Sequence, residues 1–131
     1  MPNQIFPKGG QMSANFTGTA YVNMLVPDAD GVFNCTAYDV LFEAGTRNYW
    51  HTHGGGQLLF CTDGIGYYQE KGKPARRLVK GDVVEIRPNV AHWHGAAPDS
   101  DFTHIGVSPN VDKGVVWLDA VTDEEYEKAT E

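Results

Sequence analysis

Turn-forming residues divide most of this sequence into short segments, and this division restricts the possible folds more than any other feature. Clusters rich in glycine, proline and aspartate lie at residues 27–31, 43–45, 63–64, 71–74, 80–82 and 97–101. Apolar or alternating runs that are typical of strands lie between them, at residues 16–25, 33–42, 57–62, 65–69, 77–80, 83–86 and 102–107. Many short strands at this spacing predict an all-β chain, folded as an antiparallel sandwich or barrel.

Only the two ends depart from this pattern. Near the C-terminus, Thr122 followed by Glu125 forms the capping-box pattern that starts a helix. The polar residues at the N-terminus predict an arm or edge segment. We therefore expect an arm over residues 1–15, one β-sandwich or β-barrel domain over residues 16–118, and a helical tail over residues 119–131 that packs on this domain.

Composition narrows the function classes. The net charge of −7 argues against a nucleic-acid-binding role, which normally needs a basic face. No apolar run approaches the length of a membrane span, and the first residues do not resemble a secretory signal, so we expect a cytoplasmic protein. Cys35 and Cys61 lack a CxxC spacing and lie in apolar runs, which predicts reduced, buried thiols.

Four of the five histidines occur as two HxH pairs, His51 with His53 and His92 with His94. Residues i and i+2 of a strand point to the same face, about 7 Å apart along the backbone, so each pair can direct two imidazoles to one point. A metal ion satisfies converging imidazoles economically. Gln57 follows His53 across three glycines, which let the chain turn tightly and bring the amide towards the same point.

Simpler interpretations exist for each of these features. A single buried histidine is more often a hydrogen-bonded core group than a ligand, and a glycine run can be a plain loop. Gln57 alone could equally be a polar group at a strand edge. The occurrence of two HxH pairs in a predicted barrel nevertheless favours metal binding.

The spacing of these residues resembles the cupin family. The stretch from Gly45 to Gly64, with His51, His53 and Gln57, resembles the first cupin motif, although a glutamate usually stands at the Gln57 position. Residues 81–96 resemble the second motif, with departures at Arg87, Asn89 and Ala96. The resemblance implies a single-domain double-stranded β-helix, or jelly-roll barrel, with a short C-terminal helix. It also implies a divalent metal held by His51, His53, Gln57 and His92.

The glutamine has a chemical consequence. Three imidazoles and an amide are all neutral, so they leave the charge of a divalent ion uncompensated and favour Lewis-acid chemistry. They also provide no carboxylate base, so proton transfer would fall to another histidine. His94 shares a face with His92, and His104 shares one with Phe102. Each could be structural, and both are our candidates for a catalytic or substrate-contacting role. The predicted pocket wall consists of Val40, Phe42, Leu59 and Phe102.

A narrower resemblance suggests a reaction. The segments HTH-x3-Q, HWHGAAP, FTHIGV and VTDEEY are similar to those of small bacterial cupins that are manganese-dependent hydroxynitrile lyases, and of cupins associated with carboxymuconolactone decarboxylase. This resemblance implies carbon–carbon bond cleavage in a small hydroxylated compound, with His104 as general base and His94 holding the substrate or leaving group. It favours manganese, while iron, zinc and nickel remain open.

Two other functions remain open at this point. The chain could be an iron-dependent cupin dioxygenase, or a non-enzymatic cupin that only binds a small molecule. Each of the three functions requires a small-molecule ligand, and none requires a nucleic acid or a membrane. Because exposed edge strands are a liability in a small barrel, we also expect a homodimer or homotetramer.

Overall fold

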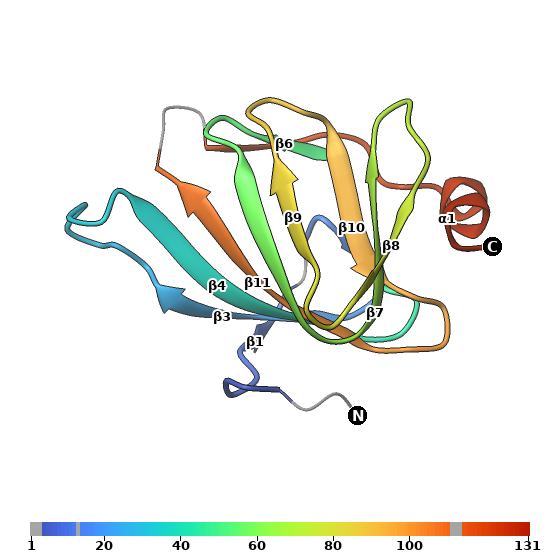
Figure 1. Ribbon diagram of the computed structural model, residues 1–131, viewed down its shortest axis with the longest axis horizontal. Helices are drawn as coiled ribbons and strands as arrows, with labels where there is room; N and C mark the ends of the chain where they lie inside the picture. The colour runs from blue at the N-terminus through green and yellow to red at the C-terminus, as the bar shows by residue number, and fades with distance from the viewer. Residues whose placement is uncertain (1–3, 13, 111–113) are drawn as a thin grey trace.

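The computed structural model describes residues 4–12, 14–110 and 114–131, which form twelve strands and one helix (Figure 1). In chain order these are β1 (Gly10–Gln11), β2 (Phe16–Thr17), β3 (Ala20–Val26), β4 (Cys35–Phe42), β5 (Arg47–Asn48), β6 (His51–His53), β7 (Gln57–Glu70), β8 (Arg76–Val79), β9 (Val83–Ile86), β10 (His92–Ala96), β11 (Phe102–Pro109), β12 (Val115–Trp117) and α1 (Asp123–Thr130). The all-β architecture with a short C-terminal helix is confirmed.

The strands form two antiparallel layers that curl towards each other (Figure 1). One layer contains β1, β3, β4, β11, β7 and β9. The other contains β2, β5, β10, β6, β12, β8 and the second half of β7. The 14-residue strand β7 thus belongs to both layers and joins them along one side of the barrel.

The predicted turn at Asp63-Gly64 is wrong, because β7 continues through it as one strand. Gly64 has a φ of 78°, a left-handed conformation that favours glycine. Up to Gly64 the strand pairs with β11, and from Ile65 onward it pairs with β8. Gly64 is therefore required for its backbone conformation, but it marks the corner where β7 passes from one sheet to the other and not a turn between two strands.

Gly64→Ala is expected to destabilise the fold more than Gly72→Ala. Both glycines have positive φ, which costs an alanine about 1–3 kcal/mol. A Cβ at Gly64 would also overlap the carbonyl oxygen of Asp101, whereas a Cβ at Gly72 would meet nothing within 4 Å. Urea unfolding of both variants measures the difference, and equal midpoints would show that the corner tolerates a side chain.

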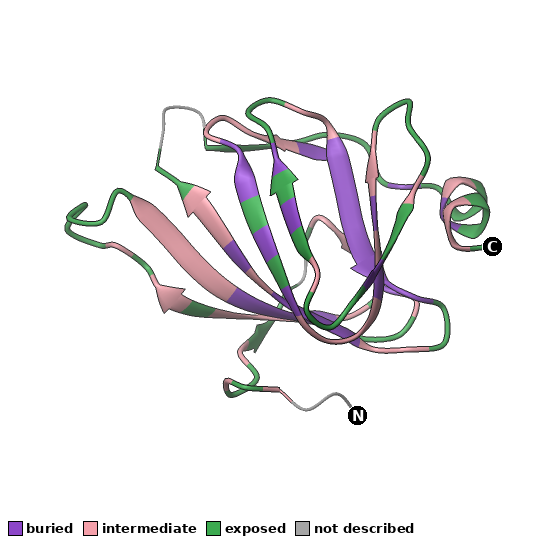
Figure 2. Cartoon of the chain, viewed as in Figure 1, coloured by how far each residue is buried: buried purple, intermediate pink, exposed green. Residues whose placement is uncertain are grey.

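The main core fills the space between the two layers. Buried residues alternate with exposed ones along β9, as expected for a strand with one face in the core (Figure 2). Phe42, Leu59, Leu78 and Phe102 are its largest fully buried apolar side chains. Cys61 is buried in this core and Cys35 is half-buried, and both are free thiols as predicted, although Cys35 is less buried than expected.

A second, smaller core lies under helix α1, and it contains Trp50, Trp93, Val121 and Tyr126. The helix begins with the predicted capping box between Thr122 and Glu125. Its Tyr126 hydroxyl donates to the Ala96 carbonyl at 2.6 Å and thereby anchors the helix to β10. Alternation along β10 places Trp93 in this second core, on the face opposite His92 and His94.

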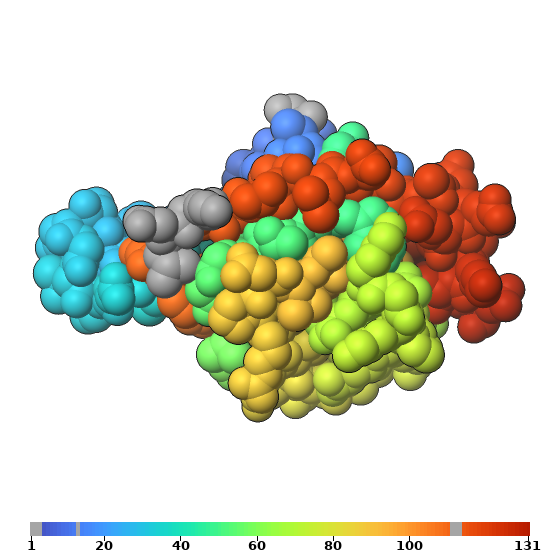
Figure 3. All heavy atoms as spheres, turned by 90° about the horizontal axis from the view of Figure 1, so that it is seen from above, coloured from blue at the N-terminus to red at the C-terminus, as the bar shows by residue number. Residues whose placement is uncertain are grey.

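The sequence did not predict strand β12, which lies between the barrel and the helix. Val115–Trp117 pairs with β6 and so adds an outer strand beside the first histidine pair. Figure 3 shows this last part of the chain, drawn in orange-red, crossing one face of the molecule towards the helix. Among the described residues, no helix has the length and apolar character needed to cross a membrane.

Candidate metal centre and active site

Two neighbouring strands bring the histidine pairs together. His51 on β6 lies directly opposite His92 on β10, and their ring centroids are 4.2 Å apart. His53 lies two residues further along β6 and faces the same point. One ligand atom from each of these three residues lies within 4.8 Å of the other two, which makes them a candidate metal site.

Main-chain hydrogen bonds fix the proton position on two of these rings. Nδ1 of His51 is 2.7 Å from the carbonyl oxygen of Tyr49, and Nδ1 of His92 is 2.9 Å from that of Val90. A carbonyl oxygen can only accept, so each Nδ1 carries the proton. In the neutral ring, Nε2 then has a free lone pair, which is the form that binds a metal.

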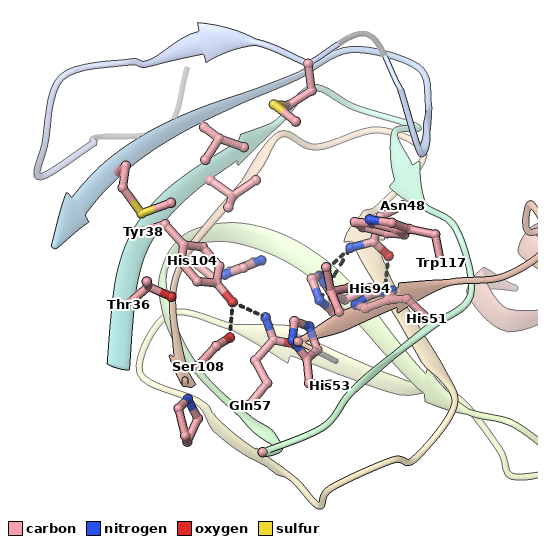
Figure 4. Close-up of a pocket in the computed structure, with 18 of the residues that line it drawn as sticks. Thr36, Tyr38, Asn48, His51, His53, Gln57, His94, His104, Ser108 and Trp117 are labelled. Atoms are coloured by element: carbon pink, nitrogen blue, oxygen red, sulfur yellow. Dashed lines mark hydrogen bonds between the residues drawn. The ribbon is translucent and has the colours of Figure 1, made fainter. Parts of the chain in front are cut away.

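Gln57 completes the group. Its Oε1 lies 3.2 Å from Nε2 of His92. Its Nε2 donates to the Tyr38 hydroxyl at 2.6 Å (Figure 4). Burial lowers the pKa of His92 to about 4, so this ring is neutral at neutral pH. Oε1 of Gln57 and Nε2 of His92 therefore face each other with a lone pair each, which is unfavourable unless both atoms bind the same cation. The donor set fits a divalent metal.

Burial lowers the pKa of every histidine in the group. The pKa of His53 falls to about 4, first through burial and then through its neighbour His92. Burial is also the largest cause of the lowered pKa values of His51 and His94. Burial lowers the pKa of His104 to about 3. All five rings are thus held in the neutral form.

These shifts predict that the metal-free protein loses stability as the pH falls below about 6.5. An unfolded histidine takes up its proton near pH 6.5, whereas folded His53 and His92 do so only near pH 4. Between these values the unfolded chain binds more protons, and each pKa unit of difference costs about 1.4 kcal/mol per group. Urea unfolding at pH 7.5, 5.5 and 4.5 measures this, and an unchanged midpoint would contradict it.

His94 lies two residues beyond His92 on β10 and is not one of the three clustered candidate ligands. Its main-chain N–H donates to Oδ1 of Asn48 at 2.9 Å, which fixes the direction of the Asn48 amide. Nδ2 of Asn48 then faces the His94 ring, 3.2 Å from Nδ1 and 3.4 Å from Nε2. This amide nitrogen can only donate, so one ring nitrogen accepts and the other retains the proton.

His104 is the only buried histidine in the described residues whose two ring nitrogens both lack a hydrogen-bond partner. It is fully buried on β11, and its ring centroid lies 4.9 Å from that of His94. A buried ring without partners requires an explanation, because burying an unpaired polar group is costly. A role towards a bound ligand is one such explanation.

A cavity of about 360 Å³ opens beside these histidines. Val40 and Phe42 line it, as predicted, together with His94 and His104. Leu59 and Phe102 do not line it, because both are fully buried in the main core, where Phe102 packs against Phe42 and His104. The side chains in Figure 4 surround this space from both layers of the barrel.

Sequence reasoning missed several residues that line the cavity. Tyr38 has the same strand parity as Val40 and Phe42, and Ser108 has the same parity as His104, so alternation could have identified both. Asn48 lies on a two-residue strand that gives no periodic signal. Trp117 lies on the unpredicted strand β12, where its ring centroid is 4.7 Å from that of His51.

A family model described as a cupin domain matches residues 38–105, which contain the four candidate ligands and His104. This chain is a cupin. The match covers about half of the sequence and includes both HxH pairs.

Two relatives resemble this cupin over nearly its whole length. A protein of Granulicella tundricola named (R)-mandelonitrile lyase is 41% identical over 114 residues, covering 86% of each chain. The crystal structure of a cupin-like protein from Thermotoga maritima has a TM-score of 0.95 with 59% identity, covering 98% of each chain.

A more distant structure shares the fold alone. The polyketide cyclase RemF from Streptomyces resistomycificus has a TM-score of 0.68 with 14% identity, covering 95% of this chain and 83% of that one. The same barrel therefore occurs in proteins with very different names, so the fold alone does not define the function.

Proposed function

We propose that this cupin is a metal-dependent lyase that cleaves a small aromatic hydroxynitrile into an aldehyde and hydrogen cyanide. The observation that carries the proposal is His104, a buried and unpartnered imidazole in the described structure, beside a neutral four-residue candidate metal site. The 41% identity to a protein named (R)-mandelonitrile lyase supports the same reaction.

The cavity suits a small substrate with an aromatic group. Val22, Val40 and Phe42 form an apolar wall next to the histidines, and Phe16 and Trp117 contribute two further aromatic rings. Apolar walls with a few polar groups are typical of small-molecule sites. An aryl group would pack on the apolar side, with the hydroxyl and nitrile directed towards the histidines.

A divalent cation held by His51, His53, Gln57 and His92 would supply Lewis acidity, which makes the substrate hydroxyl easier to deprotonate. We propose manganese, while the donor set also suits iron, zinc and nickel. None of the four side chains can act as a general base when its lone pair is occupied in this way. The proton must therefore go to another residue.

His104 performs that proton transfer in the proposed reaction. A ring nitrogen of neutral His104 accepts the hydroxyl proton while the oxygen lone pair forms the aldehyde C=O bond. The carbon–carbon bond breaks, and its electron pair leaves with cyanide. His94 donates a hydrogen bond to the departing cyanide from its protonated ring nitrogen. The proton on His104 then passes to cyanide, so that hydrogen cyanide leaves and His104 is neutral again.

Two measurements test the proposal. Elemental analysis of protein purified without added metal is expected to show about one divalent ion per chain, and mandelonitrile is expected to release benzaldehyde with equimolar cyanide. Binding of mandelonitrile or benzaldehyde without turnover would instead favour a passive binding protein. Oxygen uptake by the iron-loaded protein, with no cyanide release, would favour a dioxygenase.

A further inference from the structure

The Tyr38 hydroxyl lies between two partners in the cavity wall. It accepts from Nε2 of Gln57 at 2.6 Å, and it lies 2.6 Å from Oγ of Ser108 (Figure 4). We infer that Tyr38 is a positioning residue, whose hydroxyl holds the Gln57 amide with its oxygen directed at the metal position. The inference rests on the metal site proposed above and concerns only how Gln57 becomes a ligand.

An amide needs such control because its two ends have opposite roles. Only the carbonyl oxygen of Gln57 can bind a cation, since the amide nitrogen has no available lone pair. Nε2 of His92 carries a lone pair, so a reversed Gln57 would donate an N–H directly to it at the observed separation of 3.2 Å. In the metal-free protein that reversed amide would block the site with a favourable hydrogen bond.

The Ser108 hydroxyl determines whether the Tyr38 hydroxyl acts as donor or as acceptor towards Gln57. A phenol is a stronger donor than an aliphatic alcohol, because its hydroxyl is far more acidic. The bond between the two hydroxyls can run either way, and this difference in acidity favours Tyr38 as the donor to Ser108, which leaves its lone pairs for Gln57. A group that can only accept at this position selects the N–H₂ end of the amide and leaves Oε1 facing His92.

The fold holds the Tyr38 ring in place through a glycine. Tyr38 on β4 lies opposite Gly106 on β11, and a Cβ at Gly106 would overlap the Tyr38 ring, with 2.7 Å to its Cζ. The ring thus lies against the bare backbone of β11. Ser108 follows two residues later on the same face of β11, which places its hydroxyl beside that of Tyr38.

The test compares metal affinity in two backgrounds. Glutamate has two equivalent oxygens, so a Gln57→Glu variant needs no orientation. Tyr38→Phe is made in the wild-type and Gln57→Glu proteins, and Ser108→Ala is made in the wild type to keep the tyrosine ring. Tyr21→Phe is the control, since its hydroxyl bonds Glu43 on the surface. Calorimetric titration of each metal-stripped protein with Mn²⁺ gives the dissociation constant.

Tyr38→Phe is expected to weaken Mn²⁺ binding about tenfold in the wild type, as losses of groups that orient a ligand commonly do. Ser108→Ala is expected to weaken it by a smaller factor, because Tyr38 is then free to donate to a reversed amide. In the Gln57→Glu background, Tyr38→Phe is expected to change the affinity less than about twofold. Tyr21→Phe is expected to bind as the wild type does.

Two results would overturn the inference. An equal loss of affinity in both backgrounds would show that Tyr38 only supports the surrounding structure. Unchanged affinity in both Tyr38→Phe and Ser108→Ala would show that Gln57 orients itself. The proposed lyase function is tested separately. A wild type that binds Mn²⁺ with the expected coupling between Tyr38 and Gln57, but does not cleave mandelonitrile, would contradict the proposed function alone.

Discussion

His104→Ala is expected to bind metal as the wild type does and to lower kcat for mandelonitrile cleavage by about 10²–10⁴-fold, the usual contribution of a positioned general base. His104 lies on β11, outside the three-histidine cluster, so its removal leaves the candidate ligands intact. Neither ring nitrogen has a hydrogen-bond partner of good geometry in the described structure, so the substitution removes no strong hydrogen bond. Steady-state kinetics together with metal content measures both effects.

A smaller side chain at position 104 enlarges the cavity, so His104→Asn is the companion variant that keeps more of the volume and the polarity. Thermal unfolding of both variants shows whether the fold is intact. If folded, metal-loaded His104→Ala turns over mandelonitrile at the wild-type rate, His104 is not the base.

His51→Ala is expected to lower metal affinity by at least about a hundredfold, because even groups that only orient a ligand contribute up to that factor. His51 is buried within the cluster, and its unprotonated Nε2 is available to the same ion as His53 and His92. Lyase activity is expected to fall with the metal content. Metal titration of stripped protein, followed by the mandelonitrile assay, measures both.

His94→Ala is the matched control, since it removes a neighbouring buried imidazole that is not one of the three clustered histidines. It is expected to retain the metal and to lose activity. If His51→Ala and His94→Ala lose metal to the same extent, His94 belongs to the ligand set and its proposed contact with the leaving group is wrong.

Local sequence patterns predicted most of the fold because its turns and strands are short-range features. The strand at residues 83–86 matches β9, and the capping box of Thr122 and Glu125 forms as expected. Gly64 shows the limit of such patterns, since a glycine with positive φ is required both in a turn and at a corner within a strand. The strand pairing alone distinguishes a turn from a corner here, because β7 pairs with strands of both sheets.

The candidate site was predictable to the extent that it depends on spacing. The HxH pairs identify His51, His53 and His92, which the structure brings together. The Asn48 contact with His94 and the Tyr38 contact with Gln57 join residues that are 46 and 19 positions apart. No local pattern contains such contacts, because they arise from the order in which the strands pair.

Strand β12 has a consequence for the order in which the barrel folds. It pairs with β6 and places Trp117 against His51, although more than sixty residues separate these two in sequence. A contact between segments this far apart in sequence closes a long loop, which costs more entropy and forms more slowly than a local contact. The Trp117 wall beside His51 is therefore expected to form late in folding, after the local hairpins of the barrel.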